Sequence, residues 1–300
     1  EYMRDQKGTL GRKVVKPISA GGILRPIAIP LFGLDQTQMK QFGRGSLGEN
    51  FVLVPGGGIA IPTTYNLGSL TRGDSVTVFL ARGDFSIGGT CTATEVTDKT
   101  FSLCGHAFLG EGDIQLPAYR SSITTTFQSS YDSYKLVGQI LEPVGTVVYD
   151  NAFAVEGVRE IRPDIMIPIS LTFNVDSDRY DYNFEVFRHK FYSSTIVEMG
   201  TRSLLAKLWP ETRLGTARLA AKIYLKGRSQ PVEIYDADLI SMRKMQLGFL
   251  SGYADPWSIL SKFQQTLNSI QQSEWNFAIN RVELTLDIWS GNRVLDFDSM

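Results

Sequence analysis

The chain has 300 residues and a formal net charge of −1; 43% of the residues are hydrophobic and 20% are charged. This length can support two domains with separate cores, and the composition is that of an ordinary globular protein. The charges are balanced and no Lys/Arg cluster stands out, so no nucleic acid or anionic membrane is expected as a partner. No run approaches the roughly 20 apolar residues that cross a bilayer, so no integral membrane span is expected.

The first quarter of the chain predicts a linker followed by short strands. Residues 1–22 are polar and basic and end at a Gly-Gly pair, which is typical of a linker. A short helix is expected over 35–42. Short apolar or alternating runs separated by Gly, Pro and Asp predict strands. These runs cover residues 23–31, 51–54, 58–61 and 75–80.

The most informative stretch is a predicted hairpin that carries a histidine. Residues 90–96 are rich in Thr and Val and suit a strand, 97–99 form a polar turn, and 100–104 return. Gly105 lets the backbone turn sharply, which places the His106 imidazole at the end of a strand. A catalytic histidine would sit in such a place. The alternative is a partly buried, hydrogen-bonded core histidine.

The two cysteines of the chain lie on the two arms of this hairpin. With the turn centred near Asp98, residues whose numbers sum to about 195 face each other, and Cys91 and Cys104 have this sum. The pair therefore forms either a cross-strand disulfide or two buried free thiols. A disulfide would indicate an oxidising compartment such as the cell envelope. Two Cys and two His without ligand spacing give no reason to expect a metal site, and no cofactor is expected.

Further short strands follow at roughly ten-residue spacing, which favours a barrel or a sandwich. They are expected at 121–127, 136–140, 146–149 and 165–173. A change of composition near 173–179 then marks a boundary. We therefore divide the chain into a linker (1–22), a β domain (23–174) and an accessory domain (175–300).

The second half predicts an α+β or sandwich-like accessory domain for packing or partner binding. Residues 180–187 alternate aromatic and polar side chains, as a half-buried strand does. His189 lies between two basic residues and is interpreted as part of a solvated basic patch. A helix is expected to open at Asp255-Pro256, an N-cap followed by a first-turn proline. The remaining elements are a helix over 195–208 and strands over 215–225, 231–235 and 277–289.

Several short motifs of the first half follow one another in a fixed order. They are Gly83-Asp84, residues 90–94, Gly105-His106, Leu116-Pro117, Ser133-Tyr134-Lys135, Val144-Gly145-Thr146, Asp150, Gly157 and Ile167-Pro168. In order and spacing they resemble the SpoIVB (stage IV sporulation protein B) serine peptidase family, from about Leu24 to Pro168. The resemblance implies a mainly β fold with a trypsin-like β-barrel, export from the cytoplasm, and limited cleavage of a protein substrate.

The resemblance also implies roles for three residues. His106 would be the general base that activates a serine hydroxyl, and Asp150 or Asp84 would be the acid that orients it. A turn-capping or loop-stabilising role is the alternative for both aspartates.

The departures from the family pattern leave two functions open. The family's nucleophile motif, Ser-Gly-Ser-Pro, does not occur in this sequence, and Asn151 stands where an Arg commonly follows the Asp. The chain is then either the histidine-bearing part of a peptidase, with its serine in an upstream segment of the same precursor, or a catalytically inactive peptidase-fold module for protein binding or assembly in the cell envelope. A carbohydrate-binding sandwich is suggested only by the aromatic residues at 180–187, which core packing also explains.

Overall fold

The computed structural model describes residues 3–4, 10–11, 27–32, 51–56, 60–62, 66–127, 134–209, 213–240, 244–247, 250–253, 258–273 and 278–291. The strands of the first half are β1 (Met3–Arg4), β2 (Leu10–Gly11), β3 (Ile27–Phe32), β4 (Phe51–Pro55), β5 (Ser75–Gly83), β6 (Ser86–Val96), β7 (Thr100–Leu103), β8 (Gly112–Phe127), β9 (Tyr134–Asp150) and β10 (Val155–Val158). The second half contains β11 (Met166–Val175), β12 (Asp178–Phe187), α2 (Tyr192–Ala206), β13 (Gly215–Leu225), β14 (Val232–Ile240), β15 (Lys244–Leu247), β16 (Leu250–Tyr253), α3 (Ser258–Gln271) and β17 (Ile279–Ser290).

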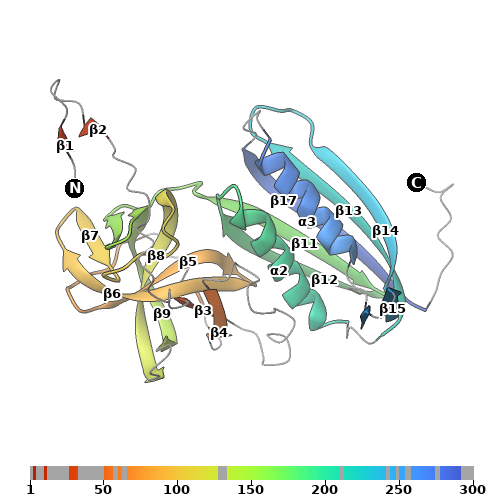
Figure 1. Cartoon of the computed structure of the whole chain (residues 1–300), viewed down its shortest axis with the longest axis horizontal. Coiled ribbons are helices and arrows are strands. Elements are labelled where there is room, and N and C mark those ends of the chain that lie inside the picture. Colours follow the sequence, from red (N-terminus) through yellow and green to blue (C-terminus); the bar gives the residue numbers. More distant parts are fainter. Residues whose placement is uncertain are drawn as a thin grey trace.

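The fold is mainly β, as the sequence predicts, and one large sheet runs through it. The strand order of this sheet is β14-β13-β17-β11-β12-β5-β8-β9-β10-β7-β6-β3-β4. Figure 1 shows its strands curling around one another at one end of the molecule and spreading into an open layer at the other. The molecule therefore has a curled part, built from β5 to β10, and a flat part, built from β11 to β14 and β17.

The curled part is a ring of strands. β5 pairs with both β6 and β8, β8 with β9, β9 with β10, β10 with β7, and β7 with β6, all antiparallel. Within it, β8, β5, β6 and β7 lie side by side in the order of a Greek key. The side chains of Val78, Leu103, Leu116 and Val147 are fully buried in the core of the ring.

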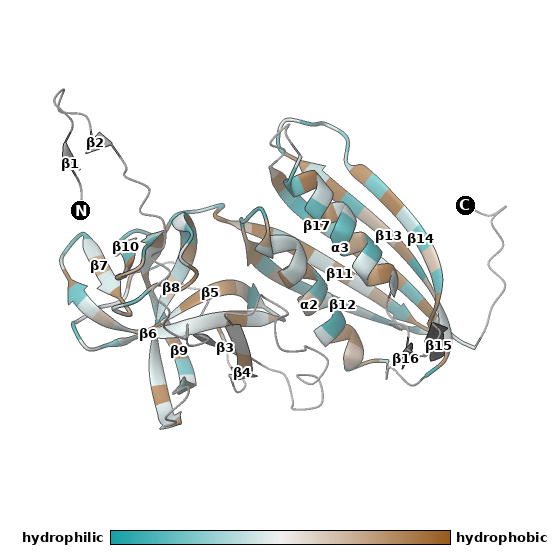
Figure 2. Ribbon diagram, viewed as in Figure 1, coloured by the Kyte–Doolittle hydropathy of each residue, from teal (hydrophilic) through white to brown (hydrophobic). Residues whose placement is uncertain are grey.

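The flat part is a two-layer α+β arrangement. β11 and β17 run parallel, while the other neighbouring strands of this part are antiparallel. The helices α2 and α3 cover one face of this layer (Figure 1). Figure 2 shows apolar and polar residues alternating along its strands, because successive side chains of a strand point to opposite faces. The half-buried strand predicted at 180–187 is confirmed as β12, with Phe184 and Val186 buried.

Strand β5 joins the two parts. Its residues 75–79 pair within the ring, and its last residues, Ala81 to Gly83, pair with Phe184 to Val186 of β12. Gly83 has a φ of +123°, and a Cβ at this position would lie 2.6 Å from the Asn183 carbonyl oxygen. Glycine is therefore required where the chain leaves the ring and meets the flat part.

Several sequence-based boundaries were wrong. The strands predicted at 136–140 and 146–149 are one strand, β9, because Pro143 and Gly145 are accommodated in register shifts opposite β8. Residues 60 and 61, predicted to end a strand, are not in one. β10 was missed; it is short, but it is paired on both sides. β14 extends to Ile240 rather than ending at Tyr235.

Other predictions fall on residues outside the described ranges. These are most of the linker at 1–22, the helix at 35–42 and the helix start at Asp255-Pro256. None of the helices that the structure describes is long and apolar enough to cross a membrane.

Candidate functional site

His106 stands at a left-handed corner that follows β7. Cys104 and Gly105 both have positive φ, of 72° and 77°. No atom lies within 4 Å of a Cβ built on Gly105, so the backbone angle rather than crowding favours glycine there. Cys104 is joined to Cys91 of β6 by a disulfide, with Cα atoms 4.7 Å apart, which decides between the two alternatives left open by the sequence. The bridge fixes the end of β7 from which His106 projects.

The His106 ring is exposed, and its Nδ1 makes a local contact. Its Nδ1 lies 2.7 Å from the backbone oxygen of Ala107. A carbonyl oxygen can only accept, so in the neutral ring this contact assigns the proton to Nδ1 and leaves Nε2 as the acceptor. The ring is therefore displayed to solvent rather than packed into the apolar core.

Asp150 organises the loop that follows His106. Its side chain lies at the end of β9 and is 1% exposed. Oδ1 accepts the N–H of Phe108 at 2.8 Å, and Oδ2 accepts those of Leu109 and Gly110 at 2.5 and 2.8 Å. Three backbone donors thus converge on one buried carboxylate, which satisfies its charge without a cationic side chain.

Asp84 has a comparable but exposed role in the turn between β5 and β6. Its Oδ2 accepts the N–H of Asn183 at 2.6 Å, and its own N–H donates to the Asn183 oxygen at 3.0 Å. It therefore ties the ring to β12. Within the described part of the chain, neither Asp84 nor Asp150 is hydrogen-bonded to His106, so the structure does not assemble the three predicted site residues into one constellation. Their catalytic assignment stays a prediction.

His189 lies in a polar cluster that sequence reasoning missed. Its ring is stacked on Phe187, with centroids 5.5 Å apart, and its side chain is only 13% exposed, so the interpretation as a solvated basic patch was wrong. Nδ1 accepts the N–H groups of Phe191 and Tyr192 at 3.2 and 3.3 Å. These contacts cap the first turn of α2, and the helix accordingly begins at Tyr192, before the predicted Thr195.

The other ring nitrogen of His189 faces the curled part. Nε2 lies 3.4 Å from Oε2 of Glu111, which comes directly before β8. Burial lowers the pKa of His189, and the Glu111 carboxylate opposes that shift. Burial also raises the pKa of Tyr192, and Glu111 adds to that rise. The His189–Glu111 pair connects residues that lie far apart in the sequence, so no local pattern could have indicated it.

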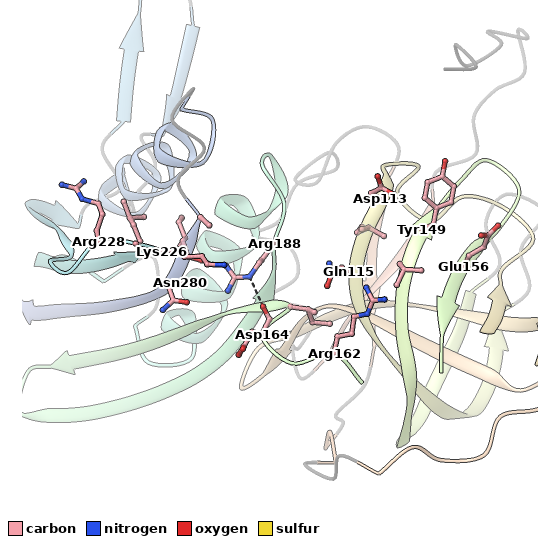
Figure 3. A pocket seen from close by; sticks show the side chains of 17 residues that line it. Asp113, Gln115, Tyr149, Glu156, Arg162, Asp164, Arg188, Lys226, Arg228 and Asn280 are labelled. Atoms are coloured by element: carbon pink, nitrogen blue, oxygen red, sulfur yellow. Dashed lines mark hydrogen bonds between the residues drawn. The ribbon is translucent and has the colours of Figure 1, made fainter. Parts of the chain in front are cut away.

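A large cleft separates the ring from the near end of the flat part, with a volume of about 1150 Å³. Figure 3 shows side chains entering it from both sides. Residues of β8, β9 and β10 line one side, including Asp113, Tyr149 and Glu156. The turn between β13 and β14 and the end of β12 line the other, including Arg188, Lys226 and Arg228. No sequence pattern indicated this cleft, because its walls come from segments that only the fold brings together.

The chain matches no protein-family model, no curated protein and no solved structure. The function is therefore argued from the geometry of the chain itself.

Proposed function

We propose that this chain is a protein-binding or assembly module built on a peptidase-like ring, and that it is not catalytic by itself. One observation carries the proposal: both oxygens of Asp150 are engaged by backbone N–H groups at the corner where His106 stands. A carboxylate in that arrangement holds a loop in place.

The chemistry of a serine peptidase explains why this matters. The histidine needs a carboxylate on Nδ1, which holds the ring and stabilises the imidazolium that forms, and a serine hydroxyl at Nε2. Here Nδ1 meets the Ala107 oxygen, and Asp84 is committed to Asn183. With neither aspartate available, His106 lacks the partner that would make it an efficient base.

The arrangement of strands supports the peptidase-like part of the proposal. The Greek-key ring would correspond to the trypsin-like barrel that the SpoIVB resemblance implies, and the two-layer part would be its accessory domain. The disulfide between Cys91 and Cys104 supports export to an oxidising compartment such as the cell envelope, where such bonds persist.

A second candidate is the histidine-bearing half of a SpoIVB-like serine peptidase that cleaves a protein substrate. The exposure of His106, with Nε2 left as an acceptor, favours it. The serine would be supplied by an upstream segment of the same precursor, and its hydroxyl would have to approach this nitrogen.

Covalent labelling by a fluorophosphonate separates the two candidates. The reagent is applied to the chain and to a longer precursor with upstream residues, each with His106 intact or as His106→Ala. For the binding module we expect no labelling that depends on His106. The matched control is Asp98→Ala in the exposed turn between β6 and β7, which leaves the His106 corner unchanged. Labelling of the precursor that His106→Ala abolishes and Asp98→Ala does not would refute the binding module in favour of the peptidase.

A further inference from the structure

The two sides of the cleft between the ring and the flat part differ in charge. We call Arg188, Lys226 and Arg228 the sheet wall, and Asp113 and Glu156 the ring wall. Figure 3 shows the two groups on opposite sides of the cleft. Arg162 also lines the ring side, where it is paired with Glu160 at 3.6 Å, and Asp164 lies beside Arg188. A ligand that offers anionic groups to the sheet wall and cationic or hydrogen-bond-donating groups to the ring wall would be complementary to the cleft.

The Arg188 guanidinium and the backbone of the Lys226 turn are held in place before any ligand arrives. The Arg188 guanidinium donates to the backbone oxygens of Asp164, Met166 and Ile279. The turn that carries Lys226 is closed by a 3.2 Å bond from the Arg228 N–H to the Leu225 oxygen. A side chain that is already fixed, as Arg188 is, loses little conformational entropy on binding.

Arg188 and Lys226 of the sheet wall have no carboxylate in direct contact among the described residues. In the described residues, no carboxylate oxygen lies within 4 Å of the side-chain nitrogens of Arg188 or Lys226. Burial lowers the pKa of Arg188, and Asp164 opposes that shift only in part. An anion placed beside Arg188 and Lys226 would therefore meet positive charge that no carboxylate contacts directly.

The ring wall restricts which anion can enter. Asp113 and Glu156 face the cleft, and Glu156 is held by a 3.2 Å hydrogen bond from Asn151. A polyphosphate or nucleic acid would bring negative charge against both carboxylates. The volume also lies above the roughly 300–1000 Å³ of small-molecule pockets. A polypeptide segment meets both conditions, because its charges can be of both signs.

We propose that the cleft binds an extended polypeptide segment whose acidic and basic side chains alternate. In an extended chain, successive side chains point to opposite sides. An alternating segment would therefore direct its carboxylates to the sheet wall and its ammonium groups to the ring wall. This inference rests on the proposed binding function and adds the place and the chemistry of the partner.

Fluorescence anisotropy with synthetic peptides of about eight residues, long enough to lie extended along a cleft, tests the proposal. The probes are an alternating Glu-Lys peptide, a block peptide of the same composition with all Glu before all Lys, and an all-Glu peptide. The alternating peptide is expected to bind the full chain most tightly. Equal binding of the block peptide would overturn the proposal, because both peptides have the same net charge.

Charge reversal identifies the walls. Lys226→Glu combined with Arg228→Glu is expected to weaken binding of the alternating peptide by about tenfold. Glu156→Lys is expected to weaken the alternating peptide but to strengthen the all-Glu peptide. Lys99→Glu, in the turn between β6 and β7, is the control because it makes the charge change of one sheet-wall substitution away from the cleft. Binding that Lys99→Glu weakens as much as the sheet-wall pair would contradict the assignment.

Two further outcomes are decisive. An oligonucleotide that binds the cleft more tightly than the alternating peptide would show that the ring wall does not select against polyanions, and the proposal would fail. A chain that binds none of these peptides and shows no His106-dependent labelling would retain the proposed binding function but overturn this inference.

Discussion

At the scale of single residues, Asp150 and Asp84 both accept backbone N–H groups, but they differ in burial. Asp150 is 1% exposed and accepts three backbone N–H groups, whereas Asp84 is exposed and accepts one. A buried N–H group that loses its acceptor destabilises the fold by its full desolvation free energy, whereas an exposed N–H group can form a hydrogen bond with water instead. Asp150 should therefore contribute far more to stability than Asp84.

Replacing each aspartate by asparagine tests this difference. In Asp150→Asn the side-chain amide must point an NH₂ group at a backbone N–H, so the free energy of unfolding should fall by about 3 kcal/mol. Asp84→Asn, the matched control, should cost less than about 1 kcal/mol. Urea denaturation of the two variants measures both values. If the two variants proved equally stable, Asp150 would not be the organiser of the loop after His106.

At the scale of elements, the ribbon of β6 and β7 depends on its disulfide. The pairing of the two strands is short and contains a register shift between Ala93 and Glu95. A crosslink across such a ribbon stabilises it chiefly by restricting the unfolded chain. The position of the His106 corner should therefore be sensitive to the redox state of the two cysteines.

Reduction of the disulfide tests its contribution to stability directly, because the chain contains only two cysteines. The bridge closes a loop with a sequence separation of 13, and its loss should lower the free energy of unfolding by about 3 kcal/mol. Urea denaturation with and without dithiothreitol measures this change. The Cys91→Ala/Cys104→Ala double variant should no longer respond to the reductant. A wild-type transition that the reductant does not shift would argue against a stabilising bridge.

The sequence predicted elements best where alternation of side chains was regular. The period of two at 180–187 identified β12, because one face is covered by helices and the other is not. The same reasoning failed at Pro143 and Gly145, which look like strand breakers but lie in the irregular pairing of β8 and β9. Whether Pro or Gly ends a strand depends on its partner strand, and the sequence of one strand does not contain that information.

At the scale of the whole molecule, the contacts between the two parts were beyond sequence reasoning. The hairpin around His106 is local and could be anticipated, but the cleft and the Glu111–His189 pair join segments from both halves. Local patterns do not report long-range pairing. His189 looked solvated because its sequence neighbours are charged, whereas in the fold it packs on Phe187 and Tyr192.

The hydrogen bonds that His189 accepts make the stability of the whole molecule depend on pH. His189 accepts two N–H groups at Nδ1, so protonation of that atom removes the cap of α2. Burial lowers its pKa below the ordinary value of 6.5. The unfolded chain therefore binds a proton at a higher pH than the folded chain does. The free energy of unfolding should be highest above pH 6.5 and should fall as the pH drops from there through the folded-state pKa.

NMR titration of the imidazole resonances measures that pKa directly, and His106→Ala assigns them because the chain has only two histidines. The Glu111 carboxylate raises the pKa of His189, so Glu111→Gln should lower it further. His189→Gln should remove the part of the pH-dependent stability that belongs to this site. A His189 midpoint at or above 6.5, or one that rises in Glu111→Gln, would mean that burial does not hold the ring neutral between the two parts of the molecule, and would contradict the predicted fall in stability below pH 6.5.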